Sequence, residues 1–145
     1  MKVTFLRHAI SIFNEMNTSE KDCELSEAGK AQARGLVGDY DLVICSVMTR
    51  TKQTLAFSQI KYKELVYSPI CREFRTTICD YLPHEDEKIP EPRESLLERV
   101  SKFREYLKEK NQGQRILVVS HGDFIFAMNG ETKYPDNAEF QELEI

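Results

Sequence analysis

The chain has 145 residues, of which 41% are hydrophobic and 30% are charged, and its formal net charge is -4. These values exclude a disordered chain and predict one globular domain over residues 1–145. The acidic balance argues against nucleic acid as the main partner, because such binding usually relies on a basic surface. The N-terminal apolar run ends at Arg7 and is too short for a signal peptide or a membrane span. We therefore expect a cytoplasmic protein with no membrane partner.

Short apolar runs alternate with amphipathic runs along the chain, and Ser26 is well placed to cap the first of the helices. In chain order we predict a strand at Val3–Arg7, a helix at about Ser26–Val37, a strand at Asp41–Ser46, a helix at about Thr49–Ser58, a helix at about Glu94–Lys110 and a strand at Arg115–Ser120. Near-continuous apolar strands separated by helices predict an α/β fold: a three-layer sandwich with a mostly parallel central sheet and helices on both faces.

Two further segments have a clear pattern. The helix predicted at 94–110 carries an apolar stripe, which we expect to face the core and which consists of Leu96, Leu97, Val100, Phe103 and Leu107. The segment Tyr81–Pro92 is rich in proline and acidic residues, so we predict an exposed loop there. Whether this loop acts as a lid is left open.

Cysteines and histidines are spaced without a metal-binding pattern. Cys23, Cys45, Cys71 and Cys79 form no C-x-x-C pair, and without a secretory signal we expect four free thiols, with buried structural roles. The three histidines, His8, His84 and His121, lie far apart in the chain. We therefore expect no metal and no cofactor.

Basic and histidine side chains follow the predicted strands at the points where the strands end. Arg7 and His8 end the first strand, Arg50 follows the second, and His121 follows the third. Because ligands of open α/β sheets bind beyond the carboxyl ends of the strands, we expect these four side chains to share one crevice. The planar forks of two guanidinium groups match the oxygens of a phosphate dianion. The sequence therefore predicts a phosphate site.

His8 is the candidate nucleophile of this site. An imidazole can attack phosphorus when one ring nitrogen is unprotonated, and neighbouring arginines favour that neutral form. The other ring nitrogen needs an acceptor, commonly a backbone carbonyl, to fix the tautomer. His121 could donate to the phosphoryl oxygens and stabilise the charge that develops during transfer.

Five segments in order along the chain resemble the signatures of one family. They are Leu6–Asn14 (L-R-H-G-x-S-x-x-N in the family), Leu25–Ala33, Ser46–Thr54, Ser120–Gly122 and Asn137–Glu139. The set is similar to the histidine phosphatase superfamily, which is phosphoglycerate mutase-like, and in its compactness to the small phosphohistidine phosphatase branch. The resemblance implies that His8 becomes phosphorylated, that Arg7, Arg50 and His121 hold the phosphoryl group, and that Asn14 is a further phosphate contact.

The resemblance also implies an acid and base. Cys71-Arg72-Glu73 is similar to the family segment L-x-E, whose glutamate protonates the leaving oxygen and then activates water. Glu73 is thus the acid/base candidate, because expelling an alkoxide is costly unless a positioned acid supplies the proton. The alternative is a surface glutamate paired with Arg72 or Arg75.

These observations predict a metal-independent phosphatase that hydrolyses a phosphomonoester or phosphoramidate through a phosphohistidine intermediate. The chain is short between Glu73 and the helix near Glu94, so we expect an open pocket, which favours a phosphatase over a phosphoglycerate mutase-like phosphotransferase. A non-catalytic phosphate-binding module stays an alternative, because Ala9 replaces the family glycine and would matter at a positive φ. Cys45 and Arg50 are separated by four residues, whereas the cysteine phosphatase loop needs five.

The sequence does not choose the substrate, which is a phosphorylated small molecule or a phosphoprotein, and it does not indicate an oligomeric state. Arg72, Arg75 and Lys52 are candidates for contacts to a second anionic group, with a solvated surface as the alternative.

Overall fold

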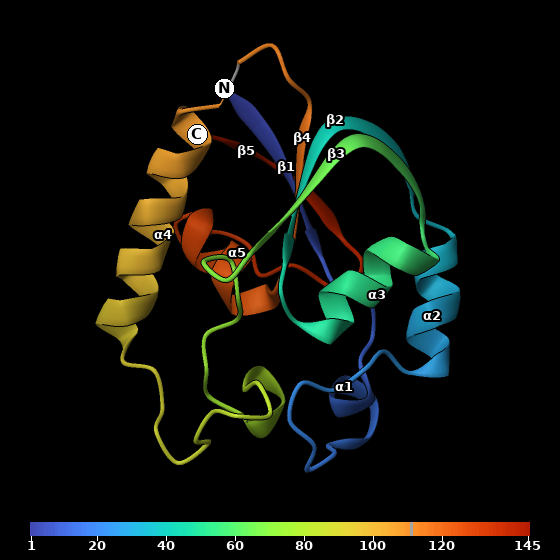
Figure 1. The fold of residues 1–145 in the computed structure, drawn as a ribbon, viewed down its shortest axis with the longest axis vertical. Helices are drawn as coiled ribbons and strands as arrows, with labels where there is room; N and C mark the ends of the chain where they lie inside the picture. Colours follow the sequence, from blue (N-terminus) through green and yellow to red (C-terminus); the bar gives the residue numbers. More distant parts are fainter. Residues whose placement is uncertain (111) are drawn as a thin grey trace.

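A computed structural model describes residues 1–110 and 112–145, and its centre is a β-sheet with the strand order β3-β2-β4-β1-β5 (Figure 1). All neighbouring strands are parallel except β5, which runs antiparallel to β1. The predicted mostly parallel sheet is thus confirmed. The strands are β1 (Lys2–Arg7), β2 (Val37–Ser46), β3 (Gln59–Ser68), β4 (Ile116–Ser120) and β5 (Phe140–Glu144).

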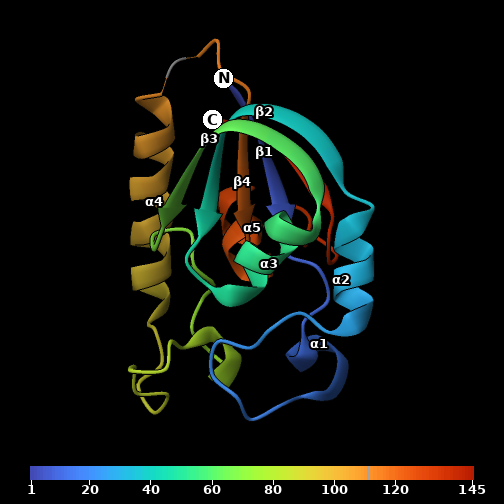
Figure 2. The same ribbon diagram turned by 45° about the vertical axis from the view of Figure 1, so that its right-hand side comes forward.

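Helices cover both faces of this sheet. In Figures 1 and 2, α4 (Arg93–Lys108) and α5 (Gly122–Met128) lie on one side, whereas α2 (Glu27–Arg34) and α3 (Thr49–Phe57) lie on the other. The short α1 (Ile12–Met16) and the 3₁₀ turn η1 (Ile78–Asp80) lie near the carboxyl ends of β1, β2 and β4. The three-layer prediction is confirmed. Within the described residues, no helix is long and apolar enough to cross a membrane.

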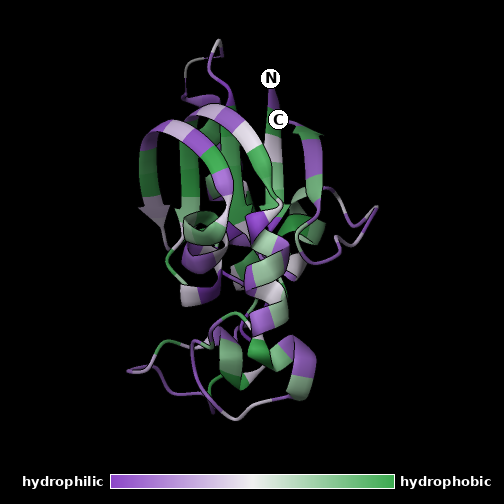
Figure 3. Cartoon of the chain, turned by 90° about the vertical axis from the view of Figure 1, so that its right-hand side faces the viewer, coloured by the Kyte–Doolittle hydropathy of each residue, from purple (hydrophilic) through white to green (hydrophobic). Residues whose placement is uncertain are grey.

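Alternating side chains of the strands fill two apolar layers. On one face Phe5 packs edge-on against Phe103 of α4, which also meets Phe124 of α5. On the other face Val43 and Val119 join a second cluster. Figure 3 shows that the strands are largely hydrophobic where helices cover them. Hydrophilic and hydrophobic residues alternate where β2 and β3 curve away from the rest of the sheet.

Several predicted boundaries and one core residue need correction. The first predicted helix ends at Arg34 and not at Val37, and β2 begins before Asp41. Leu97, assigned to the core stripe of α4, is 46% exposed, because its position in the helix faces away from the sheet. The segment 81–92 has no helix or strand, as predicted, but Tyr81 and Glu91 within it are buried.

The prediction of four free thiols is wrong. Cys23 and Cys79 form a disulfide whose Cα atoms are 5.4 Å apart, while Cys45 and Cys71 are free and buried. Because 56 positions separate the two bonded cysteines, only the folding of two loops against each other brings them together. The disulfide joins the loop before Leu25 to the turn η1.

Helix α2 holds the backbone that follows His8. Ser26 caps the helix by accepting from the N–H of Gly29 at 3.0 Å, and its own N–H donates to the Ile10 carbonyl at 3.0 Å. Gln32 of the same helix accepts from the N–H of Ile10 at 3.1 Å. A Cβ atom added at Gly29 would lie 1.9 Å from the Ile10 carbonyl oxygen. The glycine therefore permits the helix to approach the backbone.

We expect Gly29→Ala to lower the free energy of unfolding by about 1 to 3 kcal/mol, because the added methyl group must push α2 away from Ile10. Urea denaturation measures this change. The matched control is Gly35→Ala, at a helical backbone position where the nearest atom to a new Cβ is 3.6 Å away. That variant should be stabilised by about 0.4 to 1 kcal/mol. Equal effects of the two substitutions would contradict the close approach.

We expect the double variant Cys23→Ser, Cys79→Ser to lose about 4 kcal/mol of unfolding free energy, because the disulfide restricts a long loop of the unfolded chain. A dithiol reductant should lower the urea midpoint of the wild type and leave that of the double variant unchanged. Thiol titration of the denatured, unreduced wild type should give two reactive groups, from Cys45 and Cys71. Four reactive groups would show that the disulfide is absent.

Candidate active site

A cavity of about 150 Å³ lies at the carboxyl ends of β1, β2 and β4. It is lined by five of the six residues that the sequence predicted: Arg7, His8, Asn14, Arg50 and Glu73. His121, the sixth, is fully buried and is not among the lining residues, and its ring centroid lies 5.3 Å from that of His8. The structure therefore brings all the predicted residues to one place.

His8 is held in one tautomer by its neighbours. Its Nδ1 lies 2.7 Å from the Ala9 carbonyl oxygen and donates to it, which leaves Nε2 without a proton. Nε2 accepts from the Nε of Arg50 at 3.3 Å. Burial, and then the charges of Arg50 and Arg7, hold the pKa of His8 well below its usual value. The imidazole is therefore neutral, with a lone pair on Nε2.

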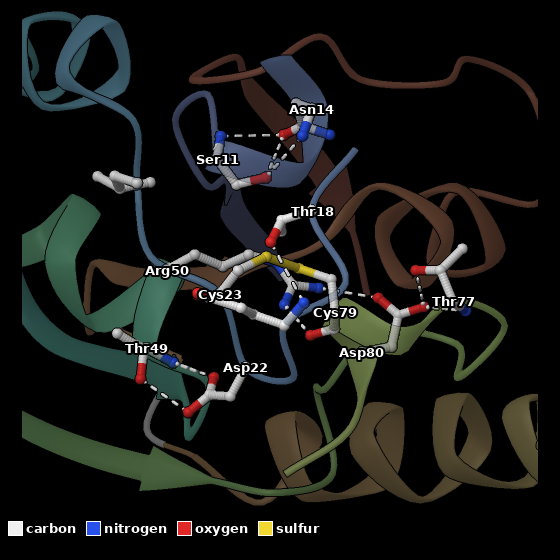
Figure 4. Close-up of a disulfide and its surroundings, with 12 residues drawn as sticks. Ser11, Asn14, Thr18, Asp22, Cys23, Thr49, Arg50, Thr77, Cys79 and Asp80 are labelled. Carbon is white, nitrogen blue, oxygen red and sulfur yellow. Dashed lines mark hydrogen bonds and ion pairs between the residues drawn. A yellow bond between two sulfur atoms is a disulfide. The ribbon is translucent and has the colours of Figure 1, made fainter. Parts of the chain in front are cut away.

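Arg50 has the most constrained side chain of the site. Besides its contact with His8, its guanidinium donates to the Cys79 carbonyl at 2.9 Å and to the Asp80 carboxylate at 3.0 Å. Both Arg50 and Asp80 are buried, so each charge offsets the burial cost of the other. Figure 4 shows the Cys23–Cys79 disulfide beside this arginine.

The loop that carries Cys23 also fixes the start of α3. The N-cap residue Met48 offers no side-chain cap, and Asp22 takes that role by accepting from the N–H and the hydroxyl of Thr49, each at 2.8 Å (Figure 4). Arg50 therefore sits in a first helical turn that is anchored from outside the helix.

His121 is fully buried and has an unpartnered ring atom. Its Nε2 lies 2.8 Å from the hydroxyl of Ser46, at the end of β2. Its Nδ1 has no hydrogen-bond partner among the described residues. Burial, followed by the charge of Arg50, lowers the pKa of His121 well below its usual value. A neutral His121 whose Nε2 accepts from Ser46 would carry a proton on Nδ1 to offer to an anion.

Arg7 and Asn14 complete the polar wall. One nitrogen of Arg7 donates to the Pro135 carbonyl at 2.9 Å, while its buried Nε has no partner. The Asn14 carbonyl oxygen accepts from Ser11 and Asn137, so its amide nitrogen is the group left for a ligand. Arg7 and Asn14 therefore each have an N–H donor that is available to bind a ligand.

Glu73 does not fit the surface alternative. It is 8% exposed, and its carboxylate accepts from the backbone N–H groups of Phe74, Asp123 and Phe124 at 2.9 to 3.1 Å. Burial, and then the charges of Asp123 and Asp80, raise the pKa of Glu73 to about 7, against the effect of those N–H groups. Its partner is thus the start of α5, and neither Arg72 nor Arg75.

A partly buried arginine, Arg99, fixes the backbone of this glutamate. Arg99 of α4 donates to the carbonyl oxygens of Ile70 and Arg72 at 2.6 and 2.9 Å and to that of Glu73 at 3.3 Å. The same guanidinium pairs with the buried carboxylate of Glu91 at 2.8 Å. The segment that carries Glu73 is therefore clamped to α4.

The three candidates for a second anion site are engaged elsewhere. Arg72 forms two hydrogen bonds to the Glu85 carboxylate at 2.7 and 2.9 Å, and Arg75 pairs with Glu91 at 3.9 Å. The ammonium of Lys52 lies 5.1 Å from the centre of the Tyr67 ring. The cavity is lined by none of the three.

The short connection that follows Glu73, on which the prediction of an open pocket rested, contributes to the cavity. Thr76, Thr77, Cys79 and Asp80 form one wall of the cavity. These residues belong to the short segment between Glu73 and α4. The Cys23–Cys79 disulfide and the hydrogen bonds from Arg50 to Cys79 and Asp80 hold this segment against the site.

Sequence reasoning missed Ser46, Asp80, Asp123 and Tyr134. Ser46 ends a predicted strand and Asp123 follows His121 by two positions, so strand-end logic could have found both. Asp80 ends the short 3₁₀ turn η1 and Tyr134 lies in a loop, and no sequence signal marked either of them. Ala9, the replacement for the family glycine, has no positive φ, so that position does not need glycine.

One family model matches the C-terminal part of the chain. Residues 61–145 match the model of the histidine phosphatase superfamily (branch 1). No curated protein matches the chain in sequence.

Solved structures share the fold. The product of open reading frame Rv3214 from Mycobacterium tuberculosis is 18% identical with a TM-score of 0.75, over 99% of this chain and 91% of that one. The alpha-ribazole phosphatase from Shigella flexneri is 19% identical with a TM-score of 0.75, over 100% and 91%. A phosphoserine phosphatase from Entamoeba histolytica is 18% identical with a TM-score of 0.69, over 97% and 89%.

At these identities the likeness to solved structures establishes the fold alone, whereas the family model covers more than half of the chain. The chain therefore belongs to the histidine phosphatase superfamily (branch 1), whose phosphoglycerate mutase-like fold it shares.

Proposed function

We propose that this protein is a metal-independent phosphatase that hydrolyses a phosphomonoester or phosphoramidate through a phosphohistidine on His8. One observation carries the proposal: the Nε2 lone pair of His8 and the raised-pKa carboxyl of Glu73 border the same small cavity, together with two arginines. A nucleophile, a proton donor and phosphate-binding cations are the groups that such a reaction needs.

In the first step His8 Nε2 attacks phosphorus, and the bond to the leaving oxygen or nitrogen breaks. Arg7, Arg50 and the Nδ1–H of His121 stabilise the phosphoryl oxygens, with the amide of Asn14 as a further contact. The proton stays on His8 Nδ1, which continues to donate a hydrogen bond to the Ala9 carbonyl oxygen. In the second step water attacks phosphorus, the bond between phosphorus and His8 Nε2 breaks, and inorganic phosphate leaves, which returns His8 to its starting state.

Glu73 moves the protons. With a pKa of about 7, it holds a proton in a large fraction of molecules near neutral pH and gives it to the leaving group. The carboxylate that remains then takes a proton from the attacking water. No group of three or more side chains suited to a metal lies together in the described ranges, and none of these steps calls on one.

Two alternatives have less support. The replacement of the family glycine by Ala9 suggested a non-catalytic phosphate-binding module, but Ala9 has no positive φ, and the acid that turnover needs, Glu73, lies in the cavity. A phosphoglycerate mutase-like phosphotransferase must hold a substrate with a second anionic group, and Arg72, Arg75 and Lys52 are engaged elsewhere. We therefore place hydrolysis first.

We also propose that the substrate is a phosphorylated small molecule, because the cavity measures only about 150 Å³. A phosphoprotein side chain is the other candidate. The cytoplasmic location stays a prediction from the N-terminal sequence, and the Cys23–Cys79 disulfide speaks against it, because disulfides persist mainly in oxidising compartments.

We expect brief incubation with a ³²P-labelled phosphodonor to give an acid-labile, alkali-stable phosphoenzyme with the label on His8. His8→Ala should abolish the label and the turnover while keeping weak phosphate binding through the arginines. Peptide mapping after an alkaline quench measures the position.

The matched control is His84→Ala, because His84 is exposed and lies outside the cavity. It should keep both label and turnover. A label on any other residue would overturn the mechanism, and turnover by His8→Ala would do the same.

We expect kcat/KM for an alkyl phosphate to fall as pH rises through about 7, because the Glu73 carboxyl must be protonated to act as the acid. Below that pH the acid is present in full. Glu73→Gln should remove this dependence and lower kcat/KM by about 100-fold or more.

The same variant should lose far less activity on p-nitrophenyl phosphate, whose leaving group needs little protonation. Initial rates from pH 5 to 9 with both substrates test the assignment. An equal loss on both substrates would contradict the role of Glu73 as acid.

A further inference from the structure

The cavity carries more carboxylates than a site for a highly anionic substrate should. Its lining includes two cationic side chains, Arg7 and Arg50, and three acidic ones, Glu73, Asp80 and Asp123. A substrate phosphate alone brings up to two negative charges. Because Glu73 holds a proton as the acid, the charges of Asp80 and Asp123 already balance those of Arg7 and Arg50, and the described lining residues leave no spare positive charge for a second anionic group of the substrate.

The end of the cavity beside His8 is the place where the phosphoryl group would bind. Arg50 contacts His8 Nε2 directly, and two buried nitrogens near that ring, Arg7 Nε and His121 Nδ1, have no partner among the described residues. His121 is fully buried, so its unpaired nitrogen is costly unless a ligand accepts from it. These groups point to an anion beside His8.

The acidic side chains differ in what they have left to bind. Asp80 is saturated: one oxygen pairs with Arg50, and the other accepts from the N–H groups of Thr76 and Thr77 and from the Thr77 hydroxyl. Glu73 has both oxygens on backbone N–H groups and serves as the proton donor. Neither is free to bind a substrate cation.

Asp123 is the carboxylate that remains. It lies in the first turn of α5 and is partly exposed. The Tyr134 hydroxyl donates to its side chain, but it forms no salt bridge among residues 1–110 and 112–145, so its charge is not paired with a cation. Its N–H donates to Glu73, so its side chain stands next to the acid and hence next to the leaving group. The Tyr134 ring already faces the Arg7 guanidinium at 5.4 Å, whereas the Phe13 ring also lines the cavity and suits an ammonium group.

We propose that the site selects phosphomonoesters of small amino alcohols, with the substrate ammonium group paired with Asp123. The inference rests on the proposed function and adds the substrate class to it. An anionic leaving group would face Asp123 without a basic partner of its own, because Arg7 and Arg50 are the only basic side chains among the described residues that line the cavity, and the phosphoryl group engages both. A cavity of about 150 Å³ suits a phosphoryl group with a chain of two or three carbons.

Three esters of nearly equal size test this: 2-aminoethyl phosphate, propyl phosphate and carboxymethyl phosphate, which carry a cationic, neutral and anionic end. We expect kcat/KM to be about tenfold higher for the aminoethyl than for the propyl ester, as one charge-assisted hydrogen bond would give. The carboxymethyl ester should be the poorest. p-Nitrophenyl phosphate reports the chemical step independently.

Asp123→Asn keeps the shape of the side chain and should bring the aminoethyl-to-propyl ratio close to one. The ratio within one variant is the readout, because loss of this charge also changes the acidity of Glu73. Asp39→Asn removes a charge at an exposed position outside the cavity and should keep the tenfold ratio. Asp123→Lys should reverse the order and favour the carboxymethyl ester.

The outcomes separate the two proposals. Turnover of propyl and p-nitrophenyl phosphate without an ammonium preference would overturn the substrate class and leave the phosphatase intact. A preference that survives Asp123→Asn would overturn the role of Asp123. No turnover of any ester, with no label on His8, would sink the proposed function itself.

Discussion

The buried guanidinium of Arg50 is the constraint on which the site depends. A buried charge is tolerated only when it is paired and hydrogen-bonded, and this one reaches His8 Nε2, the Cys79 carbonyl and the Asp80 carboxylate at once. These partners come from the end of β1 and from the turn η1, while Arg50 itself belongs to α3. Satisfying one arginine therefore brings three separate parts of the chain together around the cavity.

The same burial sets two pKa values in opposite directions. Desolvation disfavours the charged form, which for His8 is protonated and for Glu73 is ionised. The pKa of His8 therefore falls while that of Glu73 rises to about 7. Near neutral pH the cavity thus holds a neutral imidazole and a carboxyl that still carries protons, the division of roles that acid-assisted attack requires.

The ends of the strands could be predicted from the sequence, because the apolar pattern that marks a buried strand depends only on residues that are close together in the chain. An apolar run such as 115–120 marks a buried strand, and parallel strands place Arg7, His8 and His121 at one edge. The edge strand β3 was missed because lysine and glutamate interrupt its apolar pattern. The disulfide and Asp80 were missed for another reason: their positions depend on how two loops pack, and no periodicity records that. Glu73 was found through family resemblance alone.

Asp123 and Glu73 share the start of α5, so substrate binding and proton transfer are coupled there. The negative charge of Asp123 is the second largest cause, after burial, of the raised pKa of Glu73. A substrate ammonium group beside Asp123 would offset that charge and lower the pKa of Glu73, since the ionised form of Glu73 would no longer be repelled. At a pH below the lowered pKa, where Glu73 is still protonated, the lower pKa makes it the stronger acid when the leaving oxygen needs its proton. An alcohol without the ammonium group forgoes this gain, so discrimination between substrates would appear in the chemical step as well as in binding.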